Sequence, residues 1–239
     1  MYWSIMCLML FLLYSKTSNH IIFASITNED NLVRPCALND WQCIRKFFAY
    51  NSQCNPAYGP SPDPLYIARN TAYLPFINMT ITLTNDKVTG LGSAKITEFY
   101  VNKKTGNLVF AIEVKDLNQT VQKAFFNYRR TAKESIILAD SATAEFKSIT
   151  FTAVIPKDKS GLRLDLADIH ADIDDSLPLF AIGPKAYAST DPDVVTAFAS
   201  LSANLPTIIR EGLFFQAQLF TAVYIQQNIC DFGLKLFSV

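Results

Sequence analysis

The middle of the chain alternates between apolar and polar residues, which is typical of β-strands with one buried face. Met79, Ile81 and Leu83 share one face of such a segment, and the threonines between them share the other. Residues 94–101 and 107–114 have the same character and flank the turn Asn-Lys-Lys-Thr-Gly. This arrangement predicts a β-hairpin.

Further strands continue this pattern toward the C-terminus. A strand pair is expected near residues 125–139, and another strand runs through 145–156. Residues 161–174 predict one long strand, whose apolar positions change face between Leu166 and Ile169. Such a change of phase indicates a β-bulge. The middle of the chain therefore predicts a long antiparallel meander with strong curvature.

Three segments instead have the spacing of helices. Residues 40–50 predict a short helix capped by Asn39 or Asp40. Residues 191–204 start with Asp-Pro, which suits an N-cap followed by the first helical position. Residues 206–232 predict a longer helix that is apolar around most of its circumference. A helix of that kind must be buried on several sides.

The long apolar helix decides the predicted fold class. A curved sheet wrapped around it would bury most of its surface. We therefore expect an α+β protein in which a long C-terminal helix is wrapped by a strongly curved antiparallel β-sheet.

The beginning of the chain indicates secretion. Residues 3–14 are nearly all apolar, and this run is too short to cross a hydrocarbon core, which needs roughly 20 residues. No Lys or Arg precedes it, so a buried helix or a membrane anchor is the alternative. We interpret residues 1–24 as a signal peptide, cleaved between residues 17 and 27, and residues 25–239 as a single secreted domain without stable membrane insertion.

Secretion changes the interpretation of the cysteines. Cys36, Cys43, Cys54 and Cys230 lie after the predicted signal, and four thiols allow three pairings. An oxidising compartment favours disulfides, and the chain has no Cys-x-x-Cys pair that would favour a metal site. A bridge between Cys36 and Cys43 would staple the incoming chain to the helix at 40–50. Cys54 and Cys230 are the candidate second pair, and the sequence does not decide whether they are joined.

The composition argues against nucleic acid as a partner, whereas enzyme activity has to be judged from sequence motifs. The chain has zero formal net charge and is 50% hydrophobic, with 18 Phe and 10 Tyr. A neutral chain has no basic field to attract nucleic acid. The many aromatic residues indicate a large core, an apolar cavity, or both. The chain contains neither a Gly-x-Ser-x-Gly nucleophile motif nor a Gly-rich phosphate loop, so we expect no enzyme activity and no cofactor.

One acidic cluster and two sequons are the remaining candidate sites. Asp168, His170, Asp172 and Asp174 alternate along one predicted strand. Groups on one strand face project in parallel about 6.6 Å apart and do not converge on one ion, so we expect a solvated face and no metal. Asn78 and Asn118 begin glycosylation sequons, and Asn118 is preferred because it follows the predicted end of a strand.

Together these features resemble the insect Takeout and juvenile hormone binding protein family. The resemblance is carried by Cys36 and Cys43, by the segment Asp-Pro-Leu-Tyr-Ile at 63–67, by Val-Thr-Gly-Leu at 88–91, and by the long C-terminal helix. Phe-Asn-Tyr at 126–128 stands where the family has Gly-x-Tyr.

The resemblance implies a secreted carrier without catalytic activity. An elongated apolar tunnel between helix and sheet would hold a small hydrophobic ligand, such as a juvenile hormone-like terpenoid or a fatty acid. Tyr128 would orient the ligand, since the family motif places it facing the interior. The candidate wall residues are all apolar: Phe110, Ile112, Phe151, Leu213, Phe220 and Val223. The Cys36–Cys43 bridge would hold one end of the tunnel in place.

Departures from the family keep two other hypotheses open. Ala142 and Ala144 stand where the family has Gly-x-Gly, and Asn204 and Leu205 stand roughly where it has Asn and Trp. Phe126 in a glycine position favours the alternative of a secreted protein-interaction module that kept the fold and lost ligand binding; its protein partner is unknown. An enzyme that uses His170 as a base ranks last.

Overall fold

The computed structural model describes residues 31–130, 132–173 and 178–235. The predicted signal peptide, with its cleavage sites, and Asp174 lie outside the described residues. From Leu32 onward the chain forms one compact unit. None of its helices, within the part described, is long and apolar enough to span a membrane.

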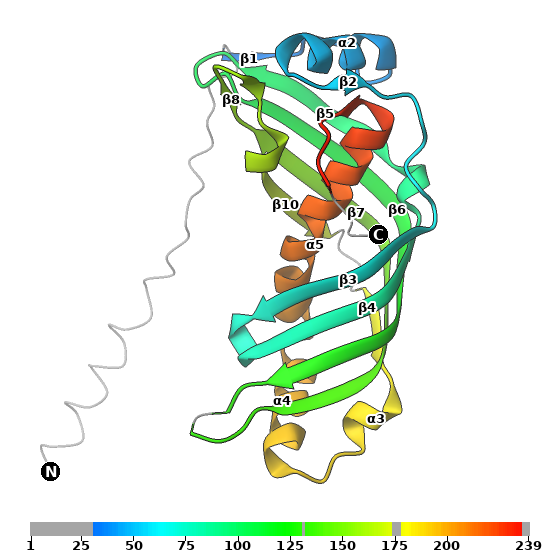
Figure 1. Cartoon of the computed structure of the whole chain (residues 1–239), viewed down its shortest axis with the longest axis vertical. Coiled ribbons are helices and arrows are strands. Elements are labelled where there is room, and N and C mark those ends of the chain that lie inside the picture. The colour runs from blue at the N-terminus through cyan, green and yellow to red at the C-terminus, as the bar shows by residue number, and fades with distance from the viewer. Residues whose placement is uncertain (1–30, 131, 174–177, 236–239) are drawn as a thin grey trace, which may run out of the picture. The chain divides into compact units, whose positions relative to one another are not determined.

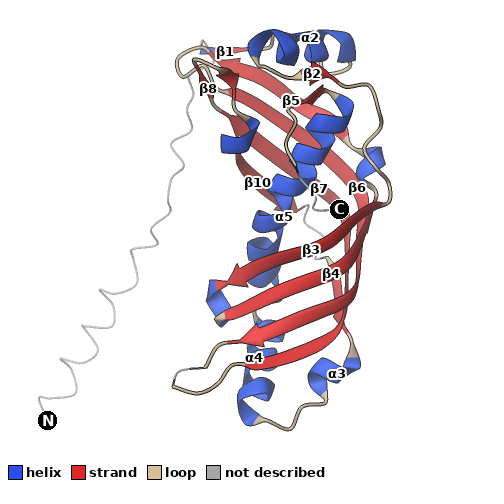
Figure 2. Cartoon of the chain, in the orientation of Figure 1, coloured by secondary structure: helices blue, strands red, loops and turns tan. Residues whose placement is uncertain are grey.

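An eight-stranded antiparallel sheet dominates the fold (Figures 1 and 2). Its strand order is β1-β5-β6-β4-β3, and β7 lies beside β6 and also pairs with β10 and β11. The strands are β1 (Leu32–Val33), β3 (Leu65–Leu74), β4 (Met79–Thr89), β5 (Lys95–Asn102), β6 (Leu108–Tyr128), β7 (Ile136–Ile155), β10 (Asp168–Ile173) and β11 (Leu179–Ile182). The predicted hairpin is confirmed as β5 paired with β6.

Short elements connect these strands. They are β2 (Asn55–Pro56), β8 (Lys157–Asp158), β9 (Gly161–Leu162) and β12 (Cys230–Asp231), with 3-10 turns η2 (Pro75–Ile77), η3 (Leu91–Ser93) and η4 (Leu164–Leu166). The prediction of one long strand over residues 161–174 is wrong, because η4 separates β9 from β10. The Arg163 guanidinium bridges Asp158 at 2.9 Å and Asp165 at 2.6 Å, which holds this turn in place.

The predicted helices are confirmed with small changes at their ends. They are α2 (Trp41–Asn51), α4 (Pro192–Ala203) and α5 (Leu205–Asn228), and a short helix α3 (Pro184–Tyr187) precedes α4. Asp40 caps α2 and Asp191 caps α4 through their carboxylate oxygens. The last helix ends at Asn228 instead of continuing to residue 232, because Cys230 enters strand β12 and pairs with Pro56.

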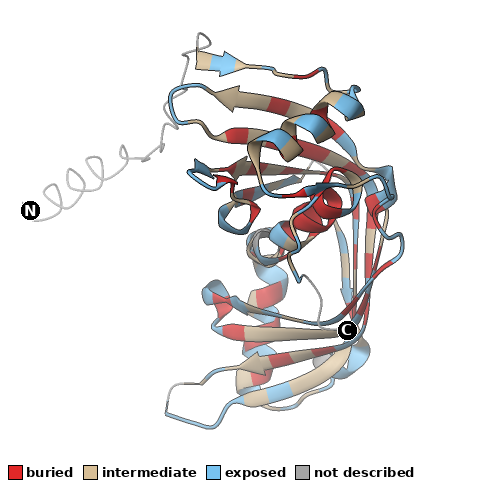
Figure 3. Cartoon of the chain, turned by 45° about the horizontal axis from the view of Figure 1, so that its top comes forward, coloured by how far each residue is buried: buried red, intermediate tan, exposed pale blue. Residues whose placement is uncertain are grey.

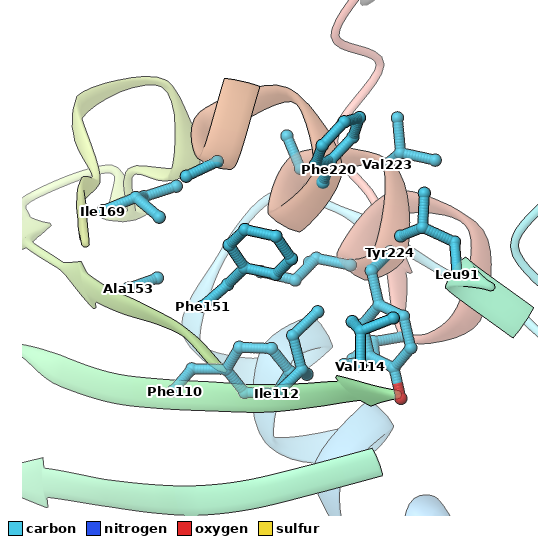
Figure 4. Packing of buried hydrophobic residues seen from close by; sticks show 14 of the residues in the cluster. Leu91, Phe110, Ile112, Val114, Phe151, Ala153, Ile169, Phe220, Val223 and Tyr224 are labelled. Atoms are coloured by element: carbon cyan, nitrogen blue, oxygen red, sulfur yellow. The ribbon is translucent and has the colours of Figure 1, made fainter. Parts of the chain in front are cut away.

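Helix α5 packs against the sheet, and buried residues gather along their interface (Figure 3). The larger apolar cluster joins α2, the C-terminal half of α5 and the adjoining strands. Its rings meet edge to face: the centroids of Phe151 and Phe220 are 5.8 Å apart, and those of Phe48 and Phe110 are 6.1 Å apart. Figure 4 shows Phe151 pointing from the sheet toward Phe220 on the helix. Such pairs strengthen a core beyond plain burial of area.

Both expected disulfides are confirmed. Cys36 is bonded to Cys43, and Cys54 is bonded to Cys230 across a sequence separation of 176 residues. The second bridge ties the segment after α2 to the end of α5.

Candidate functional site

A cavity of about 110 Å³ lies between the sheet and the N-terminal half of α5. Strands β3, β4, β6, β7 and β11 form one wall, through Asn70, Ala72, Leu74, Ile81, Leu83, Gln119, Val121, Phe126, Ala142, Thr143, Ala144, Phe146 and Phe180. Helix α5 forms the other, through Leu205, Ile208, Ile209, Gly212, Leu213 and Gln216. Most of the lining is apolar, which suits an apolar occupant.

Small side chains on both walls create this space. Ala142 and Ala144 line it from β7, at the positions where the resembled family has glycines. Gly212 lines it from α5, and a Cβ atom added there would meet no atom within 4 Å. Larger rings limit the cavity from the sheet side: Phe126 is 2% exposed and packs edge to face on Phe198 of α4, with centroids 5.7 Å apart.

Two buried glutamines bring polar groups to the apolar lining. Gln119 of β6 and Gln216 of α5 are 7% and 8% exposed, and both line the cavity. The Gln119 Nε2 donates a 2.6 Å hydrogen bond to Oδ2 of Asp86. This hydrogen bond holds the amide of Gln119 in one orientation. It uses the amide nitrogen and not the carbonyl oxygen.

Asp86 is a fully buried carboxylic acid beside this site. Burial raises its pKa to about 6, and the hydrogen bond from Gln119 opposes part of that rise. Its second oxygen, Oδ1, has no hydrogen-bond partner. Asp86 points inward because the alternation of β4 changes phase at Asn85, whose φ of 51° breaks the regular strand.

The structure places one of the seven predicted ligand residues, Leu213, at the cavity. The others of the apolar set pack in the larger core cluster away from it: Phe110, Ile112, Phe151, Phe220 and Val223. Tyr128, at the end of β6, is half-buried against the smaller apolar cluster. The C-terminal half of α5 continues the apolar stripe into this core, so the stripe alone does not locate the cavity.

The first disulfide lies away from the cavity. Helix α2 packs at the C-terminal end of α5, where Arg45 donates a 2.9 Å hydrogen bond to the carbonyl of Asn228. The cavity instead adjoins residues 205–216 of α5. The hypothesis that Cys36–Cys43 holds one end of the ligand site stays a prediction, and this cavity does not support it, because α2 packs at the opposite end of α5.

The remaining predicted sites, the acidic cluster and the two sequons, lie on or next to strands of the sheet. Asp168 and His170 lie on the exposed side of β10, with Nε2 of His170 3.3 Å from Oδ2 of Asp168. Asn118 lies within β6, paired with both Thr89 and Glu145, so the reason for preferring it, a position after a strand end, was wrong. Asn78 follows η2, and its side chain accepts a hydrogen bond from Tyr73.

Comparison with known proteins identifies the family. The sequence matches the Fibroin P25 family over residues 32–234. The chain belongs to this family. A curated relative, the fibrohexamerin of Galleria mellonella, is 26% identical over 208 residues, which cover 86% of this chain and 91% of the relative.

The fold is also similar to that of a solved structure. Takeout 1 of Epiphyas postvittana matches with a TM-score of 0.51 and 16% identity, over 82% of this chain and 95% of that one. The resemblance to Takeout inferred from motifs is therefore confirmed at the level of the fold. The family itself is Fibroin P25.

Proposed function

We propose that this chain is a secreted, non-enzymatic binding protein that associates with fibroin. The observation that carries the proposal is the match to the Fibroin P25 family over residues 32–234, almost the whole described domain. The similarity to fibrohexamerin also extends over nearly the full length of both chains. The proposal therefore concerns the whole sheet-and-helix domain and not a local motif.

The disulfides support secretion and specify the kind of association. Two bridges form within the described residues, and such bridges persist in oxidising compartments. They use all four cysteines that follow the predicted signal. No thiol remains there to link the domain covalently to another chain, so we propose that fibroin is held by non-covalent contacts.

Co-secretion tests this proposal. The chain would be expressed in insect cells together with fibroin chains from the same source, and the medium would be separated by size-exclusion chromatography. We expect co-elution that survives buffer exchange, and complete separation on a denaturing gel run without reductant. Separate elution at every concentration would contradict the proposal, and co-migration on the non-reducing gel would contradict the non-covalent mode. A matched culture expressing the chain alone controls for self-association.

A second candidate function is the binding of a small apolar molecule, as inferred first from the family resemblance. The apolar cavity beside α5 favours it. Its volume of about 110 Å³ is small compared with the roughly 300–1,000 Å³ typical of sites for drug-sized ligands. We therefore propose a compact ligand here, and an elongated tunnel only if the sheet and α5 move apart.

Native mass spectrometry separates this second function from the first. The secreted chain, not delipidated, would be measured intact and then denatured. A stoichiometric small molecule released on denaturation supports ligand binding. A chain that is empty and also takes up no apolar probe contradicts it, whether or not fibroin binds.

A further inference from the structure

The two glutamines that line the cavity beside α5 lie toward the same end of it. Pairing along the sheet gives the order of its wall residues: Phe126 lies opposite Ile81, and Gln119 lies seven positions earlier on β6, opposite Ala144. On α5 the apolar Leu205 and Ile208 begin the lining and Gln216 ends it. Each wall therefore carries a glutamine toward this end, where Phe146 of β7 also lines the cavity, and the other end is formed by apolar residues such as Phe126 and Ile208.

The two glutamines offer complementary hydrogen-bonding groups. Gln119 commits an N–H to Asp86, so its carbonyl oxygen can accept from an occupant. The side chain of Gln216 is 8% exposed, lines the cavity and can donate through its amide. A ligand group placed between the two glutamines could bond to both amides, so that its own polar atoms stay paired in a mostly apolar site.

The chemistry of this end favours a neutral head group. The described lining contains no Lys, Arg or His that could pair with a carboxylate. The adjacent Asp86, with a pKa of about 6, carries a negative charge at pH 7.5. A ligand carboxylate would meet that charge in a poorly solvated site. A hydroxyl, which donates and accepts, matches both glutamines.

We propose that the cavity binds a neutral apolar alcohol, with its hydroxyl between Gln119 and Gln216 and its hydrocarbon part toward Leu74, Phe126 and Ile208. The proposal rests on the second candidate function, ligand binding in this cavity, and names its ligand class. It does not depend on association with fibroin.

A displacement assay with matched probes tests it. A fluorescent apolar probe, N-phenyl-1-naphthylamine, would be displaced at pH 7.5 by 1-decanol or by decanoate, which have the same chain length. We expect 1-decanol to displace the probe at a concentration at least tenfold lower. Gln216→Leu should weaken 1-decanol roughly tenfold and leave decanoate unchanged. Gln218→Leu, an exposed position two residues along the same helix, is the control and should change neither.

The outcomes distinguish the head-group proposal from the cavity itself. Gly212→Phe fills the space and should abolish displaceable probe binding. Suppose that the probe binds and that Gly212→Phe abolishes this binding. If 1-decanol and decanoate then displace the probe equally well, in the wild type and in Gln216→Leu, the cavity binds ligands but the head-group proposal is overturned. If the probe does not bind the folded chain, ligand binding fails as a whole and the proposal with it. Gln119→Leu is a second variant, read only if its melting shows that it folds without the partner of Asp86.

Discussion

Asp63 links the two short segments that carry the resemblance to Takeout. Its carboxylate accepts hydrogen bonds from the backbone N–H of Gly90 at 3.0 Å and of Gly92 at 2.9 Å. The segment at 63–67 and the segment at 88–91 are the motifs that carry the resemblance to Takeout. Their similarity thus has a structural reason, because one motif caps the turn made by the other.

Gly90 should be intolerant of a side chain. Its φ is +102°, and an added Cβ would lie 2.7 Å from the carbonyl oxygen of Asp116. We expect Gly90→Ala to lower the free energy of unfolding by about 1–3 kcal/mol through backbone strain. Gly59→Ala is the control, since its Cβ would make only an ordinary 3.7 Å contact. Equal urea midpoints for the two variants would refute this account of the turn.

Asp86 should make stability depend on pH. Its folded pKa of about 6 lies above its ordinary value of 3.8, so the folded state binds the proton more tightly. The free energy of unfolding should therefore fall as the pH rises from about 4 to about 6, and stay low above that range. A shift of this size corresponds to about 3 kcal/mol.

Replacing the carboxylate tests that sign. Asp86→Asn keeps an oxygen for Gln119 and removes the charge, so it should stabilise the chain at pH 7.5 by about 2–3 kcal/mol and have little effect near pH 4. Chemical denaturation at both pH values measures the difference. The exposed Asp172→Asn is the matched control. A variant that is destabilised equally at both pH values would contradict the burial argument.

At the scale of elements, a substitution within helix α5 tests whether the space beside it is empty. Gly212 lies in the helix interior with open space around its Cα. Gly212→Ala should raise the free energy of unfolding by about 1 kcal/mol, because alanine favours the helix. Thermal and urea unfolding measure it. A loss of stability would mean that the space beside Gly212 is already occupied in solution.

The two disulfides should differ in their effect on stability. Chain-entropy arguments give about 5 kcal/mol for a loop of 176 residues and about 2 kcal/mol for a loop of 7. The double variant Cys54→Ala, Cys230→Ala should therefore melt well below Cys36→Ala, Cys43→Ala. The latter should also keep its probe affinity, since α2 lies away from the cavity. Loss of probe binding in a folded Cys36→Ala, Cys43→Ala variant would restore the original tunnel-end hypothesis.

The sequence predicted strands and helix ends correctly where one local pattern, such as alternation or an N-cap residue, determines them. The alternation of Met79, Ile81 and Leu83 predicted β4. The candidate caps, Asn39 or Asp40 for one helix and Asp191 for another, predicted where two helices begin. The break at η4 was missed because the change of apolar phase after Leu166 was attributed to a bulge within one strand, whereas a 3-10 turn produces it.

At the scale of the whole molecule, the cavity is what the sequence could not locate. Its walls come from five strands and half of one helix, so no single segment carries its signal. Gln119 and Gln216 look like ordinary surface residues until the fold buries them. A glutamine inside an apolar helix pattern, as at Gln216, was the one available hint.

The central claim is that this domain binds fibroin without a covalent link. Native mass spectrometry of the chain co-secreted with fibroin tests it most directly. We predict an intact species with the summed mass of this chain and fibroin, which separates into its chains on denaturation without reductant. A spectrum that contains only the free chain, at concentrations where fibroin is in excess, would contradict the claim.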